Sequence, residues 1–342
     1  MPCLHGDCLV IEFHDSTKSL DFRIFIDSGF SSTYAQTLRK KVTLLQAQSK
    51  AIDLFILTHS DSDHIGGIVP FLREFGTHPV REFWYNYSPL DIRVPDLTEQ
   101  VGVAQGVQLR DWLQRDGKLP SQPITSGQTY SFTQANLTVL SPKTVDFERY
   151  AEVWRKQEEQ FRNDSTLIGT KQSDHHKSVE ELSQRPFALD TSLSNRSSIA
   201  LLIEFGETVM LFTSDSHPDV LVASLEALGY SPTNPLRLDL MQVPHHGSRG
   251  NINPELLDLI DCRHFLLSTN ASNSHRFPHK EALARVITSA HGKQPHEPIW
   301  FYFPYAEKKL QDLFSPAELA RYHIIIQYPV ADELGIVLRF PH

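Results

Sequence analysis

Apolar residues recur along the chain in two patterns that predict different elements. Short runs rich in β-branched and aromatic residues predict strands, and they lie at 8–13, 22–27, 81–87, 136–142, 197–205, 208–215, 236–243, 262–269, 299–303, 322–328 and 335–340. Apolar residues spaced three and four apart predict helices, at 33–47, 68–76, 102–115, 218–229 and 279–290. Residues 52–58 form one continuous apolar run, the pattern of a strand buried on both faces.

One polar segment interrupts this alternation. Residues 143–194 are dominated by Glu, Gln, Lys, Arg, Ser and Asp, with scattered apolar positions. We predict an insertion there, helical around 146–161 and mobile around 170–190, within a single domain that spans residues 1–342. Strands mixed with helices, with polar clusters at strand ends, predict an α/β fold of two sheets enclosed by helices.

Composition and charge narrow the class of protein. Of 342 residues, 40% are hydrophobic and 21% charged, as in ordinary globular proteins. No apolar run approaches the ~20 residues that span a bilayer, and the first residues show no secretion signal, so we expect a cytoplasmic protein that binds no membrane. Its cysteines are expected to be reduced core thiols. The net charge of −9 argues against a broad basic surface for duplex nucleic acid, but not against a nuclease, because bound divalent ions reverse the local field.

The strongest chemical signal is the segment LTHSDSDHIGG, residues 57–67. Directly after the buried strand, an extended backbone points His59 and Asp61 to one side, and the turn that follows offers Asp63 and His64 to a neighbouring position. Imidazole and carboxylate ligands together suit zinc, manganese or iron. The alternative, a polar turn that caps a helix at Asp63, leaves the other three groups unexplained.

This segment resembles the HxHxDH signature of the metallo-β-lactamase superfamily, with Asp61 in place of the second histidine. The resemblance implies an αββα sandwich that holds one or two divalent ions, with His59 and Asp61 at the first site and Asp63 and His64 at the second. A carboxylate is a harder ligand than imidazole, so the replacement shifts the preference from zinc toward manganese or magnesium. We expect Zn²⁺ or Mn²⁺, with Mg²⁺ as a further candidate.

Two more strand ends fit the same resemblance. IFIDSG, residues 24–29, resembles the early strand that ends in Asp-x-Gly, so Asp27 is expected to hold a ligand in place. MLFTSDSH resembles the strand that presents the carboxylate shared by both ions, which makes Asp215 the expected bridging ligand. A helix N-cap is the alternative role for Asp215.

The last two motifs lie near residues 245 and 279. VPHHGSRGN resembles the PHHGS motif of the ComEC-type branch, found in a DNA-uptake protein, and of phosphorylcholine esterases. One of His245 and His246 is expected to bind metal and the other to contact substrate or act as an acid; the sequence leaves the choice open. In NSHRFPHKEAL, which resembles the closing loop of that group, His275 and His279 are candidates, and we predict His279 as a ligand. A capping or surface role is the alternative for both.

The resemblance implies hydrolysis by a metal-bound hydroxide. Two ions about 3.5 Å apart lower the pKa of a shared water to near neutrality, and an imidazole or water protonates the leaving group. The expected catalytic residues are Asp63, His245 and His246. Cations expected to converge on the substrate are Arg249, Arg276 and Lys280. Asn195 is expected to orient the substrate, although turn formation explains it nearly as well.

Three functions from different classes compete. A phosphodiesterase or nuclease is favoured by the ComEC-like motifs and the three cations. A lactone, amide or peptide hydrolase is the alternative, since the fold hosts all of these chemistries. An inactive metal-binding scaffold that acts through a partner is the third. The expected partner is a phosphodiester or another small hydrolysable substrate, with single-stranded nucleic acid as one candidate; the sequence leaves the question of a protein partner open.

Overall fold

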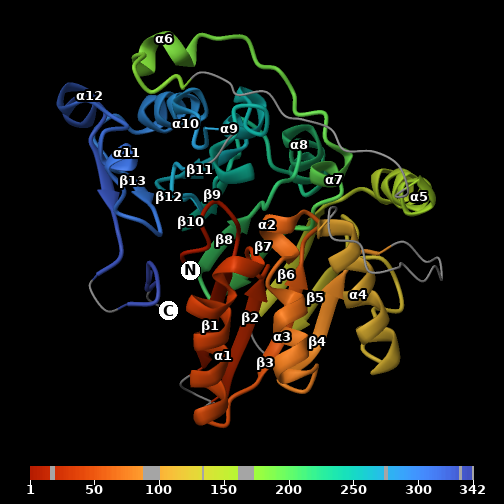
Figure 1. Cartoon of the computed structure of the whole chain (residues 1–342). Coiled ribbons are helices and arrows are strands. Elements are labelled where there is room, and N and C mark those ends of the chain that lie inside the picture. Colours follow the sequence, from red (N-terminus) through yellow and green to blue (C-terminus); the bar gives the residue numbers. More distant parts are fainter. Residues whose placement is uncertain are drawn as a thin grey trace.

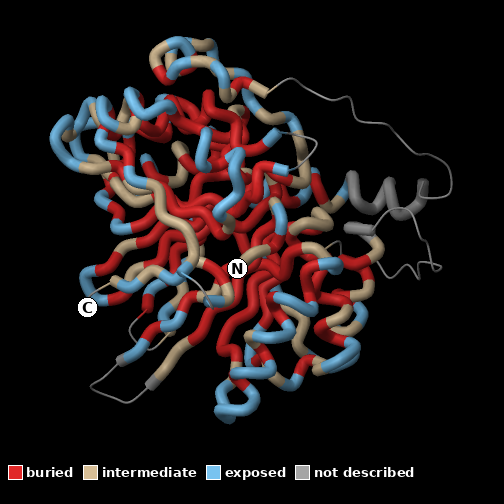
Figure 2. Tube along the Cα trace, turned by 60° about the vertical axis from the view of Figure 1, so that its left-hand side comes forward, coloured by how far each residue is buried: buried red, intermediate tan, exposed pale blue. Residues whose placement is uncertain are grey.

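Two β-sheets lie face to face in the interior, and helices cover their outer faces (Figure 1). The computed structural model describes residues 1–15, 20–87, 101–132, 135–160, 173–272, 276–330 and 333–340. The predicted α/β class, with two mixed sheets flanked by helices, is confirmed. The buried residues run through the centre of the molecule (Figure 2), and one cluster of them joins the inner faces of both sheets.

The first sheet is built from the N-terminal quarter of the chain. Its strands, in spatial order, are β1 (Leu9–Asp15), β2 (Leu20–Ile26), β3 (Ile52–Leu57) and β4 (Val80–Tyr85). The first pair is antiparallel and the other two pairs are parallel. Every residue of β3 is buried, as the continuous apolar run predicts: Leu54 packs between the sheets and Phe55 under the outer helices.

The second sheet has eight strands and a mixed topology. In spatial order they are β14 (Ile324–Gln327), β13 (Ile299–Tyr302), β12 (His264–Leu266), β10 (Leu240–Gln242), β8 (Thr208–Phe212), β7 (Ala200–Phe205), β6 (Ala135–Ser141) and β5 (Thr129–Phe132). Pairing is parallel from β14 to β8 and antiparallel from β8 to β5. A small parallel sheet pairs β9 (Leu236–Leu238) with β11 (Ile260–Cys262).

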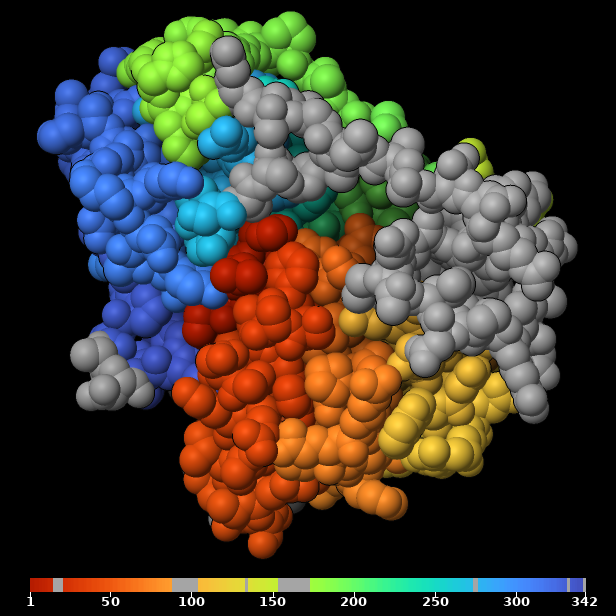
Figure 3. All heavy atoms as spheres, viewed as in Figure 1, coloured from red at the N-terminus to blue at the C-terminus, as the bar shows by residue number. Residues whose placement is uncertain are grey.

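Helices cover both outer faces. Those beside the first sheet are η1 (Ser31–Gln36), α1 (Leu38–Ala47), α2 (Ser62–Ile65), α3 (Ile68–Phe75) and α4 (Val101–Arg115). Those of the second half are α5 (Thr144–Gln160), α6 (Val179–Ser183), α7 (Leu193–Arg196), α8 (Pro218–Ala227), η2 (His245–Gly247), α9 (Pro254–Asp258), α10 (Lys280–Lys293), α11 (Lys308–Gln311) and α12 (Pro316–Arg321). The first residues lie against the C-terminal half (Figure 3), where Leu4 N donates to the Tyr305 hydroxyl at 2.6 Å.

Three strand predictions differ from the structure. The run 236–243 divides into β9 and β10 because the backbone N–H of Asp239 donates to Val209 O while its carboxylate accepts from Val209 N, both at 2.8 Å. The run 262–269 is also divided, because its first residue ends β11 and β12 begins at His264. Residues 335–340 form no strand; they run beside the inner face of β1.

The polar segment 143–194 is in part closely packed. Its predicted helix is present as α5. In α6, Val179 and Leu182 are fully buried, and Val179 N donates to the Glu318 carboxylate at 2.9 Å. The mobility predicted around 170–190 therefore does not fit the described residues 173–190, and residues 170–172 lie outside the described part. Among the described residues, none of the helices is long and apolar enough to span a bilayer.

Candidate metal centre

The turn after β3 carries four of the predicted ligands. It leads into α2, which holds Asp63 and His64 in its first turn. Gly66 and Gly67, which follow, have ordinary helical φ values of −58° and −78°. They permit a close approach between two segments, since a Cβ on Gly67 would lie 2.3 Å from Ser28 O. Close packing against this backbone fixes where α2 directs His64.

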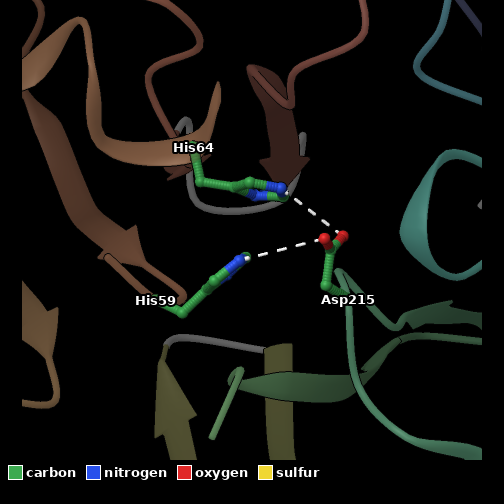
Figure 4. A group of neighbouring side chains, drawn as sticks. All are labelled: His59, His64 and Asp215. Atoms are coloured by element: carbon green, nitrogen blue, oxygen red, sulfur yellow. Dashed lines mark ion pairs between the residues drawn. The ribbon is translucent and has the colours of Figure 1, made fainter. Parts of the chain in front are cut away.

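Asp215 stands at the centre of the site, three residues after β8 (Figure 4). Its carboxylate is buried, and its two oxygens face different histidines. Oδ1 lies 3.4 Å from His64 Nε2 and 3.8 Å from His246 Nε2. Oδ2 lies 3.5 Å from His245 Nε2 and 3.9 Å from His59 Nε2. One carboxylate thus lies between two sets of imidazoles.

The adjacent histidines of η2 point to opposite sides of that carboxylate. His245 and His246 both adopt left-handed backbone conformations, with φ of 48° and 55°. His246 reaches the Oδ1 side of Asp215, where its Nε2 lies 3.3 Å from Asp63 Oδ2. His245 reaches the Oδ2 side. The sequence left open which of the two faces a metal; the structure turns both toward the centre.

The other two acidic residues divide between the same two sides. Asp61 Oδ2 lies 3.6 Å from His59 Nε2, and its Oδ1 accepts from Ser194 Oγ at 2.5 Å. Asp63 Oδ2 lies 3.9 Å from His64 Nε2. Ligand atoms of Asp63, His64 and His246 lie within 4.8 Å of one another, as do those of His59, His64 and Asp215. One set therefore surrounds each oxygen of Asp215.

Buried carboxylates lie behind two of the histidines, His64 and His246. Asp27 accepts from His64 Nδ1 at 2.7 Å and from the backbone and hydroxyl of Thr58 at 2.8 and 2.7 Å. The proton on Nδ1 leaves the Nε2 lone pair directed into the centre. Asp7 accepts from Gln242 at 2.7 Å, and its Oδ1 lies 3.9 Å from His246 Nδ1. Asp7 was not predicted as a site residue; the tripeptide HGD before β1 was its only signal.

The donor set fits divalent ions. Within the described part of the chain, four converging buried atoms have no hydrogen-bond partner: His59 Nε2, His64 Nε2, His246 Nε2 and Asp215 Oδ1. Each such atom costs roughly 1–3 kcal/mol if left unsatisfied. Imidazole nitrogens and carboxylate oxygens around a shared carboxylate are the ligands of a two-metal site.

Opposite charges at the centre shift one another's pKa values. Burial lowers the pKa of His64, but Asp215, Asp27 and Asp63 outweigh it, and the pKa stands well above its ordinary value. Burial likewise opposes the charge on His245, but Asp215 and Asp190 raise its pKa to about 9. Asp215 is held well below its ordinary pKa, because His245, His64 and His246 outweigh its burial. The raised pKa values of His64 and His245 therefore favour their protonated forms in the absence of metal.

Metal affinity should therefore rise with pH. An ion must displace the protons of His64, His245 and His246, whose pKa values are raised, so affinity should increase from pH 6 toward pH 9 by about tenfold per pH unit for each proton released. Competition with a chelator at pH 6, 7 and 8 measures this, and calorimetry in buffers of different ionisation enthalpy counts the protons. An affinity that is flat between pH 6 and 8 would contradict the assignment.

A cavity of about 700 Å³ opens beside the centre. His5 and Phe30 line one part of it and Phe277 another, while residues 188–192 of the predicted insertion line a further wall. Of the described residues that line it, only Arg249 carries a permanent positive charge. Its side chain is 38% exposed and lies 3.8 Å from Glu281.

The structure brings some predicted substrate residues to this cavity and leaves others out. Asn195 lines it, with Nδ2 donating to Asp190 at 2.7 Å. The prediction for Lys280 is wrong, because its buried ammonium pairs with Glu318 at 2.9 Å. Arg276 is exposed and is not among the residues lining the cavity.

The last motif supplies no ligand among the described residues. His279 lines the cavity, but it belongs to none of the close His and carboxylate groups, and its Nδ1 accepts from Arg249 N at 3.2 Å. Its position as the N-cap residue of α10 corrects the prediction of a ligand role. His275 lies outside the described residues.

Comparison with known proteins supports this assignment. The sequence model of the Metallo-beta-lactamase superfamily matches residues 2–82, which include the turn after β3. The N-terminal part of the chain is therefore similar to the metallo-β-lactamase superfamily. ComE operon protein 3 of Bacillus subtilis (strain 168) is 22% identical over 278 residues, which are 76% of this chain and 27% of that protein. The chain thus spans about a quarter of the length of this curated relative.

Solved structures with similar folds include the metallo-β-lactamase fold protein YhfI from Bacillus subtilis. It is 11% identical, covers 98% of this chain and 95% of its own, and has a TM-score of 0.44. CmlA, a diiron β-hydroxylase from Streptomyces venezuelae, is 14% identical, covers 86% and 52%, and has a TM-score of 0.38. The match to the family model and the close groups of His and carboxylate side chains together indicate divalent metal binding.

Proposed function

We propose that this metallo-β-lactamase enzyme hydrolyses a phosphodiester, in DNA or in a nucleotide. The observation that carries the proposal is the division of ligand atoms between the two oxygens of Asp215. They lie beside a cavity in which Arg249 is the one permanent cation among the described lining residues. Paired metals beside a cation suit a group that gains negative charge during displacement at phosphorus.

The proposed ligands form two sets that share Asp215. The first set is His59, Asp61 and His245, and the second is Asp63, His64 and His246. Zinc and manganese are the proposed ions, because each set mixes imidazole with carboxylate. When bound, a pair of such ions supplies an activated water and polarises the scissile bond.

The protein's own groups bind and orient the substrate. The Arg249 guanidinium is placed to donate two hydrogen bonds to a phosphoryl group. Asn195, whose Oδ1 is buried and has no hydrogen-bond partner among the described residues, is placed to accept one from substrate. Phe30, half-buried at the cavity wall, offers a ring face to a base. These groups bind substrate locally, so the overall charge of −9 is compatible with a nucleotide or a short single strand.

Replacing Arg249 by alanine should lower kcat/KM for phosphodiesters about 10- to 100-fold, the value of one charged hydrogen-bonding group. Initial rates on bis-p-nitrophenyl phosphate and on a single-stranded DNA oligonucleotide, with zinc or manganese, measure the effect. Arg237→Ala is the matched control, because Arg237 is exposed on β9 and is not among the residues lining the cavity. It should leave the rate within twofold.

Two other outcomes of this activity screen would contradict the proposal. A protein loaded with zinc, manganese or magnesium that leaves every phosphodiester intact, yet opens lactones or cuts amides and peptides, is the alternative hydrolase. A protein that binds metal and turns over none of these substrates is the scaffold that acts through a partner.

A further inference from the structure

The strap formed by residues 188–192 places one carboxylate, that of Asp190, behind the candidate metal centre. The strap is fixed to the loop after η2, since Asp190 N donates to Gly250 O at 3.0 Å. A Cβ on Gly250 would lie 3.0 Å from Asp190 N, so the two backbones touch. Asp190 Oδ1 accepts from Ser192 N at 3.0 Å, which fixes the carboxylate relative to its own backbone.

The other oxygen of Asp190 faces a group of polar side chains around His245. Oδ2 accepts from Asn195 Nδ2 at 2.7 Å and from Asn251 Nδ2 at 3.2 Å. It lies 3.4 Å from His245 Nδ1 and 3.6 Å from His217 Nε2. Asn251 is fully buried and is held in turn by the backbone oxygen of Asp215, at 3.1 Å. The Asp190 carboxylate is thus held by more polar contacts than are needed to fix a side chain on a surface loop.

These contacts decide which nitrogen of His245 carries the proton. Nδ1 has two acceptors beside it, the Asn251 Oδ1 at 3.0 Å and the Asp190 carboxylate. The nearby amide of Asn195, 3.3 Å away, has a closer acceptor in Asp190. The proton of neutral His245 therefore belongs on Nδ1, and the lone pair of Nε2 points toward Asp215 Oδ2.

We propose that Asp190 is a positioning residue, which fixes His245 with its proton on Nδ1 and so presents Nε2 as a third protein side-chain ligand beside His59 and Asp61. The inference rests on the metal centre of the proposed function, not on the phosphodiester substrate. On this inference, the segment 173–194 contributes a residue that positions a metal ligand in the active site.

Two other histidines of the centre have a carboxylate on the same side of the ring, whereas His59 Nδ1 faces the hydroxyls of Thr58 and Ser198. His64 has Asp27 behind its Nδ1, and His246 has Asp7 on that side. A carboxylate behind a metal-binding imidazole fixes the ring and raises its basicity, and its removal typically costs 10- to 100-fold in metal affinity. Asp190 gives His245 the equivalent partner, although it comes from a segment whose sequence shows no motif.

The test is Asp190→Asn, which keeps the size of the side chain and removes its charge, with Asp190→Ser as a second variant should the first fail to fold. Long-range proton–nitrogen NMR on the zinc-loaded protein identifies the metal-bound nitrogen of His245, with His245→Ala supplying the assignment. We expect bound Nε2 and protonated Nδ1 in the parent protein. In Asp190→Asn, chelator competition should show zinc affinity at one site lowered about 10- to 100-fold. Asp219→Asn, an exposed carboxylate on α8, is the matched control.

A double-mutant cycle separates positioning from general support of the structure. If Asp190 acts through His245, Asp190→Asn adds less than twofold to the loss of affinity in His245→Ala. Additive losses, or a His245 whose Nε2 is not bound to zinc in the parent, overturn the inference. Failure of the proposed function looks different: zinc affinity that depends on Asp190, in a protein that cleaves no phosphodiester, refutes the substrate and supports the role of Asp190.

Discussion

Asp215→Asn should lower turnover at least about 100-fold, roughly 2.7 kcal/mol of transition-state stabilisation, while the fold survives. Asparagine has the same shape, and the backbone contacts of residue 215 with Ser198 and Asn251 do not involve the carboxylate. The substitution removes the negative charge that lies between the two sets of imidazoles and leaves one oxygen to serve both. Rates on an activated phosphodiester at saturating metal measure the loss, and circular dichroism with thermal melting checks the fold.

Asp219→Asn provides the comparison for this variant. Asp219 is an exposed carboxylate in the first turn of α8, four residues further along the chain, and pairs with Arg196 at 2.9 Å. Its loss should leave turnover within twofold, since surface ion pairs contribute about 0–1 kcal/mol. An Asp215→Asn protein with parental turnover and parental metal content would show that the two sets of ligands do not depend on a shared carboxylate.

The parts of the site that were predictable from the sequence are those that local backbone geometry brings together. His59, Asp61, Asp63 and His64 lie within six residues after a buried strand, so the end of β3 and the first turn of α2 place them in one region. Asp215, three residues after β8, was predicted instead from the resemblance of MLFTSDSH to the strand that presents the shared carboxylate.

The residues that sequence reasoning missed depend on contacts between distant segments. Asp7 reaches His246 from the N-terminal loop, and Asp190 reaches His245 from the polar segment, with no pattern of spacing that indicates either contact. The same limit explains the error for Lys280. It lies within the closing motif, but the first turn of α10 directs its side chain toward Glu318 rather than toward the cavity.

The fold shows a similar division between local and distant information. Continuous or alternating apolar runs predicted most strands, because the residues of a strand themselves show which of its faces is buried. The break of one run at Asp239 depends on pairing with Val209, thirty residues earlier. Residues 335–340 have the apolar content of a strand but no strand pairing in the structure, so pattern alone could not exclude one.

Replacing both Asp63 and His64 by alanine should remove about one equivalent of divalent metal per chain and abolish most activity. Both side chains belong to the set on the Oδ1 side of Asp215. Their loss leaves His246 Nε2 and that oxygen to face the centre, since the Asp7 carboxylate lies beside the other ring nitrogen of His246, with Oδ1 3.9 Å from Nδ1. Two protein ligands are too few to hold zinc, which takes three or four. The set on the Oδ2 side, with His59 and His245, keeps its contacts. Elemental analysis after dialysis against buffered zinc measures the stoichiometry.

The control for this double variant must also remove a carboxylate and an imidazole that are not ligands. His14 and Asp21 serve, because they pair at 2.7 Å on the exposed end of β1 and β2, outside every close group of candidate ligands in the described chain. Their replacement by alanine should leave metal content unchanged. If instead the Asp63 and His64 variant keeps its full metal content, the second set is not a metal site. If it loses both equivalents, the two ions bind as one cooperative unit through Asp215, and single replacements on the Oδ2 side should then also lose both.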